Sequence, residues 1–374
     1  MRKLKNKRII LKIGSSSIVN SDLTVNYKLL NSLMNSFKKL QDSGVQIVLV
    51  TSGAIALGRS VLGLKNKPKT MALKQACAAI GQARLMEEYN NVGQKYGVKC
   101  GQILLNHDDF QIRSRLHFLQ DCLEECLKNK VIPIINENDA LAVEEIKVGD
   151  NDTLASLLVP VIDANLLILF SDIDGFYDKN PKLYDDAKLI NEVDKIDDSI
   201  LRMAGDATSN VGTGGMATKV NAAIMTTSVG CDMIICNSNR ISDLEAIISG
   251  EEIGTLFKAK RSISEREHWI IFRSNSLGRI YVDDGLKKIL GTKKVSILPK
   301  GILKVEGSFL ENSVVDVVDK DGMVIAKGVT NYSSTLIDDI KGLSKEEILF
   351  EKNIDKALII HADNLVIIKE DKVC

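Results

Sequence analysis

The sequence has no long hydrophobic run, although 45% of its 374 residues are hydrophobic and can form a sizeable core. Its apolar stretches are short: Leu166 to Phe170 is closed at once by Ser171 and Asp172, so none approaches the length of a membrane span. The basic residues 1–8 precede an apolar run that Lys12 interrupts, without a small-residue cleavage site, which argues against an export signal. We therefore expect a cytoplasmic protein.

The chain also lacks a net charge and closely paired cysteines. Its 49 basic and 49 acidic residues cancel, so no overall field attracts nucleic acid or an anionic membrane. The seven cysteines show no CxxC spacing, which favours buried, reduced thiols and argues against a structural zinc site. Any contact with a charged partner must therefore be local.

Apolar, β-branched runs recur along the first two thirds of the chain, and each ends in small or polar residues before a helical pattern. This alternation predicts an α/β fold with a mostly parallel sheet sandwiched by helices, and ligands at the carboxyl ends of the strands. The predicted strands are Ile9 to Ile13, Val45 to Val50, Val131 to Ile135, Leu166 to Phe170 and Met233 to Cys236, and the clearest predicted helices are Tyr27 to Leu40, Thr70 to Tyr89 and Arg113 to Lys128.

The pattern changes after the charged segment Arg261 to Glu267. Short alternating strands separated by Gly and Asp turns follow, for example Val314 to Val318 and Met323 to Lys327, and they predict a small β domain. We expect a catalytic domain at 1–260, a linker at 261–275, the β domain at 276–360 and a C-terminal tail at 361–374.

A glycine-rich loop, Gly212 to Lys219, leads directly into the helical pattern Val220 to Val229. Its glycines allow backbone amides to approach a phosphate, and the helix N-terminus directs its N–H groups at the same anion. Thr218 precedes Lys219 rather than following it, so the loop is not a Walker motif. The alternative is an ordinary loop before a helix.

Two polar residues lie at or near the ends of the first two predicted strands. Lys12 lies near the end of the first strand, where an unpaired charge is costly; a bound phosphate would satisfy it, and the alternative is a side chain that extends to solvent at the sheet edge. Ser52 lies between the second strand and a helix, where it would contact a bound carboxylate or merely cap the helix.

Carboxylates and amides gather in three further segments, two of which directly follow predicted strands. Asn136 to Asp139 and Gly149 to Thr153 could bind an ammonium ion or hold lysines or magnesium in place, whereas Asp152 or Thr153 could instead cap a helix. Ser171 to Pro181 follows the apolar strand Leu166 to Phe170, and we interpret it as a nucleotide-contacting loop.

Taken together, these segments resemble the glutamate 5-kinases, a branch of the amino acid kinase family with a C-terminal PUA domain, and the resemblance covers nearly the whole chain. It implies ATP-dependent phosphorylation of the side-chain carboxylate of L-glutamate to L-glutamyl 5-phosphate, the first step of proline biosynthesis, with ATP and Mg²⁺. By this resemblance, Lys12 and Lys219 stabilise the transferring phosphoryl group and Asp152 organises them. The resemblance further implies that glutamate is contacted by Ser52, Asp139 and Asn151, and ATP by Lys12, Ser171, Asp172, Thr213, Gly214, Gly215, Met216, Ala217, Thr218 and Lys219.

The implied chemistry needs no general base, because the glutamate side-chain carboxylate is already ionised at neutral pH. This agrees with the four histidines, which lie in no motif: His107, His117, His268 and His361. The resemblance also implies a homo-oligomer, a tetramer in the family, together with feedback inhibition by proline and transfer of the product to glutamyl-phosphate reductase.

The C-terminal segment matches the PUA pattern, for example in Leu298 to Ile302 and Val305 to Phe309. PUA domains often bind RNA, but acidic residues offset the lysines here, so a regulatory or structural role is favoured over RNA binding. Two other functions remain open: a kinase for another acidic or N-acetylated amino acid, and an RNA-binding regulator built on the PUA domain. The offsetting acidic residues are Asp316, Asp319, Asp321, Asp338 and Asp339.

Overall fold

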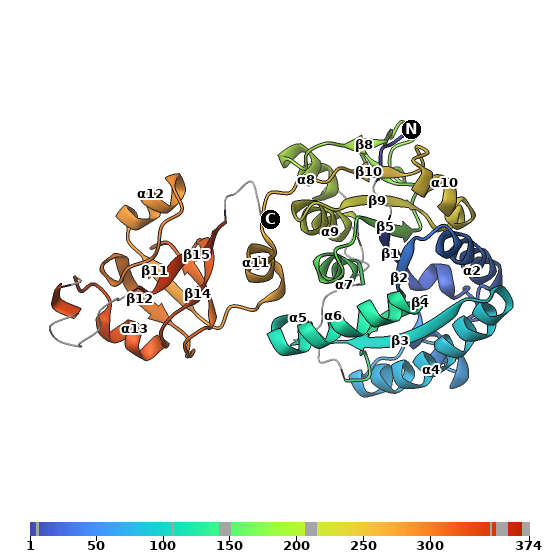
Figure 1. Cartoon of the computed structure of the whole chain (residues 1–374), viewed down its shortest axis with the longest axis horizontal. Coiled ribbons are helices and arrows are strands. Elements are labelled where there is room, and N and C mark those ends of the chain that lie inside the picture. The colour runs from blue at the N-terminus through green and yellow to red at the C-terminus, as the bar shows by residue number, and fades with distance from the viewer. Residues whose placement is uncertain are drawn as a thin grey trace. The chain divides into compact units, whose positions relative to one another are not determined.

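The chain divides into two units, Met1–Ser262 and Ile263–Cys374, each with its own sheet (Figure 1). The computed structural model describes residues 1–4, 7–106, 108–141, 151–205, 215–344, 346–348 and 358–368. Within these residues, no helix is both long and apolar enough to cross a membrane.

The first unit is built on an eight-stranded sheet with the order β3-β4-β2-β1-β5-β9-β10-β8. Its strand pairs are parallel except for β9 and β10, which run antiparallel. All five predicted strands are present, so the prediction of a mostly parallel α/β sheet is confirmed. The strands are β1 (Arg8–Ile13), β2 (Gln46–Val50), β3 (Lys99–Leu105), β4 (Val131–Glu137), β5 (Leu166–Ser171), β8 (Glu192–Val193), β9 (Asp232–Asn237) and β10 (Thr255–Phe257), with a separate pair, β6 (Phe176–Tyr177) and β7 (Leu189–Ile190).

Helices cover both faces of this sheet. Alternate residues of β1 point to opposite faces, and Ile9, Leu11 and Ile13 share a buried core with α2, α4 and α10. The other face is covered by α7 and α9 (Figure 1). The helices of this unit are α1 (Ser15–Ile18), α2 (Tyr27–Asp42), α3 (Ala54–Val61), α4 (Met71–Tyr96), α5 (Asp108–Gln111), α6 (Arg113–Lys128), α7 (Asn151–Leu158), α8 (Asp198–Gly205), α9 (Met216–Ser228) and α10 (Leu244–Ser249), with 3₁₀ turns η2 (Val159–Val161) and η3 (Ser238–Asp243).

Helices α3 and α4 pack so closely that their backbones touch. A Cβ atom added to Gly81 would lie 1.8 Å from the carbonyl oxygen of Ala54, and one added to Gly58 would lie 1.9 Å from that of Cys77. Both positions therefore require glycine for a steric reason, because no other residue fits between the two helices. This contact fixes the start of α3, which follows directly on β2.

The second unit contains a five-stranded sheet with the order β12-β11-β13-β14-β15. Its core is formed by apolar residues of the strands and helices, such as Ile280, Val317 and Ile337. The elements are α11 (Glu265–His268), the π-helical turn η4 (Trp269–Arg273), β11 (Arg279–Val282), α12 (Asp284–Thr292), η5 (Pro299–Gly301), β12 (Ile302–Glu306), β13 (Val314–Val318), β14 (Val324–Thr330), α13 (Ser334–Ile340) and β15 (Ile360–Ile367).

Three local expectations differ from the structure. Residues 361–367, expected in a tail, lie in β15, which pairs with β14; the largely polar segment His361 to Asn364 hides the strand pattern. The expected linker at 261–275 contains α11, which a Ser264 capping box begins. Among the cysteines described, all free, Cys122 is exposed rather than buried.

Candidate active site

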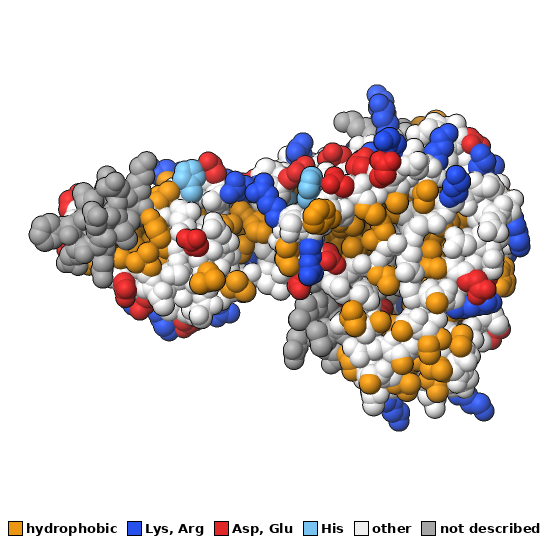
Figure 2. All heavy atoms as spheres, turned by 60° about the horizontal axis from the view of Figure 1, so that its bottom comes forward, with side chains coloured by type: hydrophobic (Ala, Val, Ile, Leu, Met, Phe, Trp, Pro, Cys, Tyr) orange, Lys and Arg blue, Asp and Glu red, His pale blue; other side chains and the backbone are white. Residues whose placement is uncertain are grey.

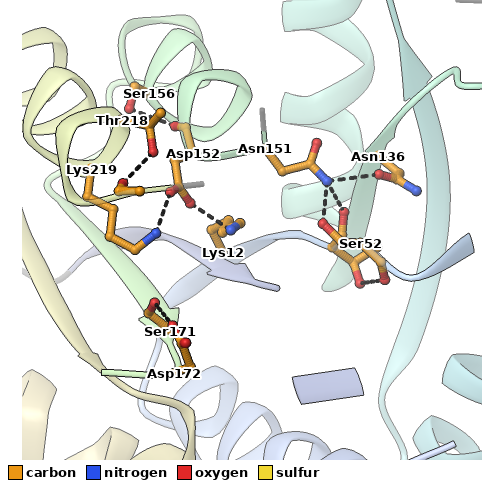
Figure 3. A network of polar contacts seen from close by, with 12 residues as sticks. Lys12, Ser52, Asn136, Asn151, Asp152, Ser156, Ser171, Asp172, Thr218 and Lys219 are labelled. Carbon is orange, nitrogen blue, oxygen red and sulfur yellow. Dashed lines mark hydrogen bonds and ion pairs between the residues drawn. The ribbon is translucent and has the colours of Figure 1, made fainter. Parts of the chain in front are cut away.

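Two lysines and one aspartate meet at the carboxyl end of β1 (Figure 3). The Nζ atom of Lys12 lies 2.7 Å from Oδ1 of Asp152, and the Nζ atom of Lys219 lies 2.9 Å from Oδ2. Asp152 is 2% exposed and Lys219 is 6% exposed, so the three charges are held largely away from water. The structure thus brings together the three residues predicted to act on the phosphoryl group.

The fold explains how residues so far apart in sequence meet. Lys12 lies between Leu11 and Ile13 in β1. The side chains of Leu11 and Ile13 face the core shared with α2. Because side chains alternate along a strand, Lys12 faces the opposite side of the sheet, which α7 and α9 cover. Asp152 lies in the first turn of α7, and Lys219 lies in the first turn of α9. The ammonium group of Lys12 pairs with the carboxylate of Asp152 instead of extending to water, so the alternative prediction of a solvent-exposed side chain is wrong.

The charges of this group do not balance. Burial by itself raises the pKa of the Asp152 carboxyl, but the two ammonium groups outweigh burial and hold that pKa below its ordinary value of 3.8. Asp152 is therefore ionised at neutral pH, and two positive charges face one negative charge. The two ammonium groups are suited to contact an anion at this end of the sheet.

A second polar group adjoins the first, because Asn151 precedes Asp152 in α7. The side-chain amide of Asn151 donates to Oγ of Ser52 at 2.5 Å, to the carbonyl oxygen of Thr51 at 2.7 Å and to Oδ1 of Asn136 at 3.1 Å (Figure 3). Helix α3 is capped by Gly53, without a side-chain cap bond, so the alternative of Ser52 as the helix cap is wrong.

Amide side chains extend this group into the sheet. Asn136 donates to Oε1 of Gln82 at 3.0 Å, and Gln82 donates to Oε1 of Gln102 at 3.0 Å. This chain of amides joins α7, β4, α4 and β3. Each amide uses its nitrogen or its oxygen for a neighbour in the chain, so the orientation of each amide group is fixed. The sequence indicated Asn136 as part of the polar segment Asn136 to Asp139, but it indicated neither Gln82 nor Gln102. Gln82 lies in mid-helix, where no local signal marks it.

A cavity of about 360 Å³ lies beside these polar groups. It is large enough for a small metabolite, and its wall carries amides, hydroxyls and charges of both signs. Asp139, one of the residues predicted to contact substrate, lines it together with Ser52 and Asn151. The cationic residues of the wall, which the sequence did not indicate, are Arg59, Lys67 and Lys74.

The described residues that we predicted to contact the nucleotide lie near the carboxyl ends of β1 and β5 and at the start of α9. Ser171 ends β5 and is paired with Asn237 of β9, and its hydroxyl donates to Oδ1 of Asp172 at 3.1 Å (Figure 3). Gly215 caps α9, and the hydroxyl of Thr218 donates to its carbonyl oxygen at 2.8 Å. Met216 and Ala217 form the first turn of α9, whereas Thr213 and Gly214 lie outside the described residues.

The first unit has a mostly parallel sheet covered by helices, with one lysine near the end of β1 and a second in the first turn of α9, and the model of the amino acid kinase family matches residues 7–237. A PUA domain model matches residues 278–351. The chain is 43% identical to the glutamate 5-kinase of Caldanaerobacter subterraneus and 42% identical to that of Geobacter sulfurreducens, in each case over 97% of this chain and 98% of the relative. It therefore belongs to the glutamate 5-kinase family. The glutamate 5-kinase of Methanococcoides burtonii is 41% identical over 97% of both chains.

Proposed function

We propose that this chain transfers the γ-phosphoryl group of ATP to the side-chain carboxylate of L-glutamate, forming L-glutamyl 5-phosphate, the first step of proline biosynthesis. The observation that carries the proposal is the Asp152 carboxylate held between Lys12 and Lys219, next to a cavity of about 360 Å³. The similarity to glutamate 5-kinases supports glutamate as the acceptor.

The acceptor needs no base, since a glutamate side chain has a pKa of about 4.3 and is ionised at neutral pH. What the chain must supply is position and compensation for negative charge. Lys12 and Lys219 carry that positive charge. Asp152 fixes both ammonium groups, because its Oδ1 atom binds that of Lys12 and its Oδ2 atom binds that of Lys219. Because these groups are already oriented, little reorganisation is needed when charge develops on the transferring group.

The nucleotide would lie along the carboxyl ends of β5 and β9 and at the start of α9. Ser171 and Asp172 lie at the first of these ends, and the backbone N–H groups of the first turn of α9 would donate to a phosphate bound there. Thr213 and Gly214 remain predicted contacts of the nucleotide.

Mg²⁺ would be held mainly by the nucleotide phosphates. Among the described residues, no group of three or more His, Cys, Asp or Glu side chains could hold a metal ion by itself. This fits Mg²⁺, which commonly takes one or two carboxylates together with substrate phosphates, and Asp152 and Asp172 lie in the same part of the site (Figure 3). When bound, Mg²⁺ would neutralise phosphate charge.

Glutamate would occupy the cavity beside Asn151. Ser52 and Asn151 offer neutral polar groups, and the carboxylate of Asp139 would bind the substrate ammonium group. Because Asn151 and Asp152 are adjacent in α7, an amino acid bound at Asn151 would lie near the two lysines, which supports transfer to its side-chain carboxylate.

A trapping assay tests this function. The protein is incubated with ATP, Mg²⁺ and hydroxylamine, which converts an acyl phosphate to a hydroxamate, and glutamate, aspartate and N-acetylglutamate are offered in parallel. We expect hydroxamate from glutamate alone. A signal from another acid alone would refute the assigned acceptor, and no signal from folded protein would refute the kinase function.

For the PUA domain we propose a regulatory or structural role. Several of its lysines pair with acidic side chains: Lys287 with Asp319, and Lys320 with Asp284. Among the residues of this domain that the structure describes, positive and negative side chains are intermingled on the face shown in Figure 2, and no basic stripe typical of RNA-binding surfaces is seen there. A homo-oligomer, proline inhibition and transfer of the product to a reductase stay predictions from the resemblance.

A further inference from the structure

Ser52 and Asn151, which the proposed function assigns to the amino acid, are joined by a hydrogen bond just after the end of β2 (Figure 3). Thr51 holds both of them: its carbonyl oxygen accepts from the side-chain amide of Asn151 at 2.7 Å, and its hydroxyl donates to the carbonyl oxygen of Ser52 at 3.3 Å. Its backbone N–H donates to the carbonyl oxygen of Ile135 in β4 at 2.8 Å. Thr51 is 0% exposed, so it acts on a ligand in the cavity only through its neighbours.

The hydroxyl of Thr51 is in turn held by Tyr89 of α4. The two hydroxyl oxygens lie 2.7 Å apart, and the Tyr89 side chain is fully buried. Burial raises the pKa of Tyr89, so its hydroxyl stays protonated at neutral pH. Because the single proton of the Thr51 hydroxyl is donated to the Ser52 carbonyl, Tyr89 is the donor to Thr51. A series of hydrogen bonds therefore runs from α4 through Thr51 to the carbonyl group of Ser52.

The peptide unit at the end of this series forms the turn into α3. Its carbonyl group belongs to Ser52 and its N–H group to Gly53, which has a left-handed φ of 108°, and both residues line the cavity. A peptide unit is planar, so a hydrogen bond that fixes its carbonyl oxygen also fixes the direction of its N–H group. If Thr51 were no longer held, this peptide unit and the amide of Asn151 would lose a support, and a functional site tolerates shifts of only about 0.5 Å.

We propose that Tyr89 is a positioning residue for the amino acid substrate: its hydroxyl fixes Thr51, and Thr51 in turn keeps the polar groups of the cavity in the geometry that binds glutamate. The inference rests on the proposed function, since it concerns how the site for glutamate is kept in shape.

The group that acts on the phosphoryl group has supports of its own. Asp152 is fixed by its ion pairs with Lys12 and Lys219, and neither lysine is bonded to Thr51 or Tyr89. Loss of the Tyr89 hydroxyl should therefore weaken the binding of glutamate more than it changes turnover or the binding of ATP.

The test removes this hydroxyl and follows the two substrates separately. Steady-state kinetics give the KM for glutamate, the KM for ATP and kcat of wild type, Tyr89→Phe and Tyr96→Phe. We expect Tyr89→Phe to raise the KM for glutamate by about 3- to 10-fold, the usual effect of losing one hydrogen bond, while the KM for ATP and kcat change by less than about 2-fold.

Tyr96→Phe is the matched control, because it removes the same group from the same helix. The hydroxyl of Tyr96 donates to Oδ1 of Asn31 at 3.2 Å, and neither of these residues lines the cavity. Tyr96→Phe should therefore leave all three kinetic constants nearly unchanged, even if it lowers the melting temperature as Tyr89→Phe does.

Variants of Thr51 test the other half of the series. Thr51→Val removes the hydroxyl and should raise the KM for glutamate as Tyr89→Phe does, whereas Thr51→Ser keeps the hydroxyl and should stay near wild type. Because Tyr89→Phe and Thr51→Val break the same hydrogen bond, the KM of the double variant should be lower than the product of the two single effects predicts.

A folded Tyr89→Phe protein that keeps the wild-type KM for glutamate, or in which the KM values for both substrates rise equally, would overturn the inference while leaving the kinase function intact. If Tyr89→Phe does not fold, the comparison of Thr51→Val with Thr51→Ser decides, and equal KM values for glutamate would overturn the inference. A wild-type protein that forms no acyl phosphate from glutamate would instead refute the proposed function, and the inference with it.

Discussion

Replacement of Gly81 by alanine is expected to separate α3 from α4 and to disturb the amino acid cavity. The added Cβ atom would lie 1.8 Å from the carbonyl oxygen of Ala54 and 2.4 Å from the backbone nitrogen of Gly58. Contacts under 3.0 Å are essentially never seen for Cβ atoms, so the helices must move apart by at least about 1.2 Å. Both partners are backbone atoms, and neither can rotate away.

The size of the effect follows from this displacement. Overpacking of a core typically costs about 1–3 kcal/mol, and a clash with backbone belongs at the upper end of that range. At about 2–4 °C per kcal/mol for a unit of this size, the melting temperature of the first unit should fall by about 6–12 °C. Ala54 begins α3 and lines the cavity with Ser52, and a shift of this size exceeds the tolerance of about 0.5 Å for a functional site. The KM for glutamate should rise by about 10-fold or more.

Thermal unfolding followed by circular dichroism, and steady-state kinetics at varied glutamate, measure both effects. Gly291→Ala is the matched control, because Gly291 lies in helix α12 of the second unit and a Cβ atom there meets nothing within 4 Å. That variant should be as stable as wild type or gain up to about 1 kcal/mol. If Gly81→Ala melts like wild type and keeps its KM, the steric reasoning is wrong.

Three further predictions concern charged groups. Lys219→Ala should abolish phosphoryl transfer while leaving the fold intact, and a folded variant with full turnover would disprove its role. Because the pKa of Asp152 is lowered in the folded chain, its ion pairs stabilise the fold above pH about 4, and that stability is lost as the pH falls through the folded pKa; melting curves of Asp152→Asn should depend less on acid pH than those of wild type. Arg2 donates to the carbonyl oxygens of Asn191, Ile253 and Gly254, so Arg2→Met should lower the melting temperature by several degrees, and an unchanged value would contradict this account.

In the first unit, the strands that sequence alone revealed were runs of five or more residues that are buried along most of their length. β5 is buried at every residue and stood out as an apolar run, whereas β3 is partly exposed at the sheet edge, contains Lys99 and Gln102, and was missed. β15 was missed because polar residues interrupt it. Hydrophobic patterning reports burial, so it identifies central strands more readily than edge strands.

The sequence by itself determined the class of fold, the division into an α/β part and a β part, and the segments that carry charge and glycine near strand ends. The tertiary structure decided which of these groups meet: Lys12, Asp152 and Lys219 come from one strand and two helices, and the alternation of β1 together with the packing of α7 and α9 brings both ammonium groups into ion pairs of 2.7 and 2.9 Å. The place of Gln82 in the chain of amides also depended on the fold, because a residue in mid-helix acquires a polar partner from another element only when that element packs beside it.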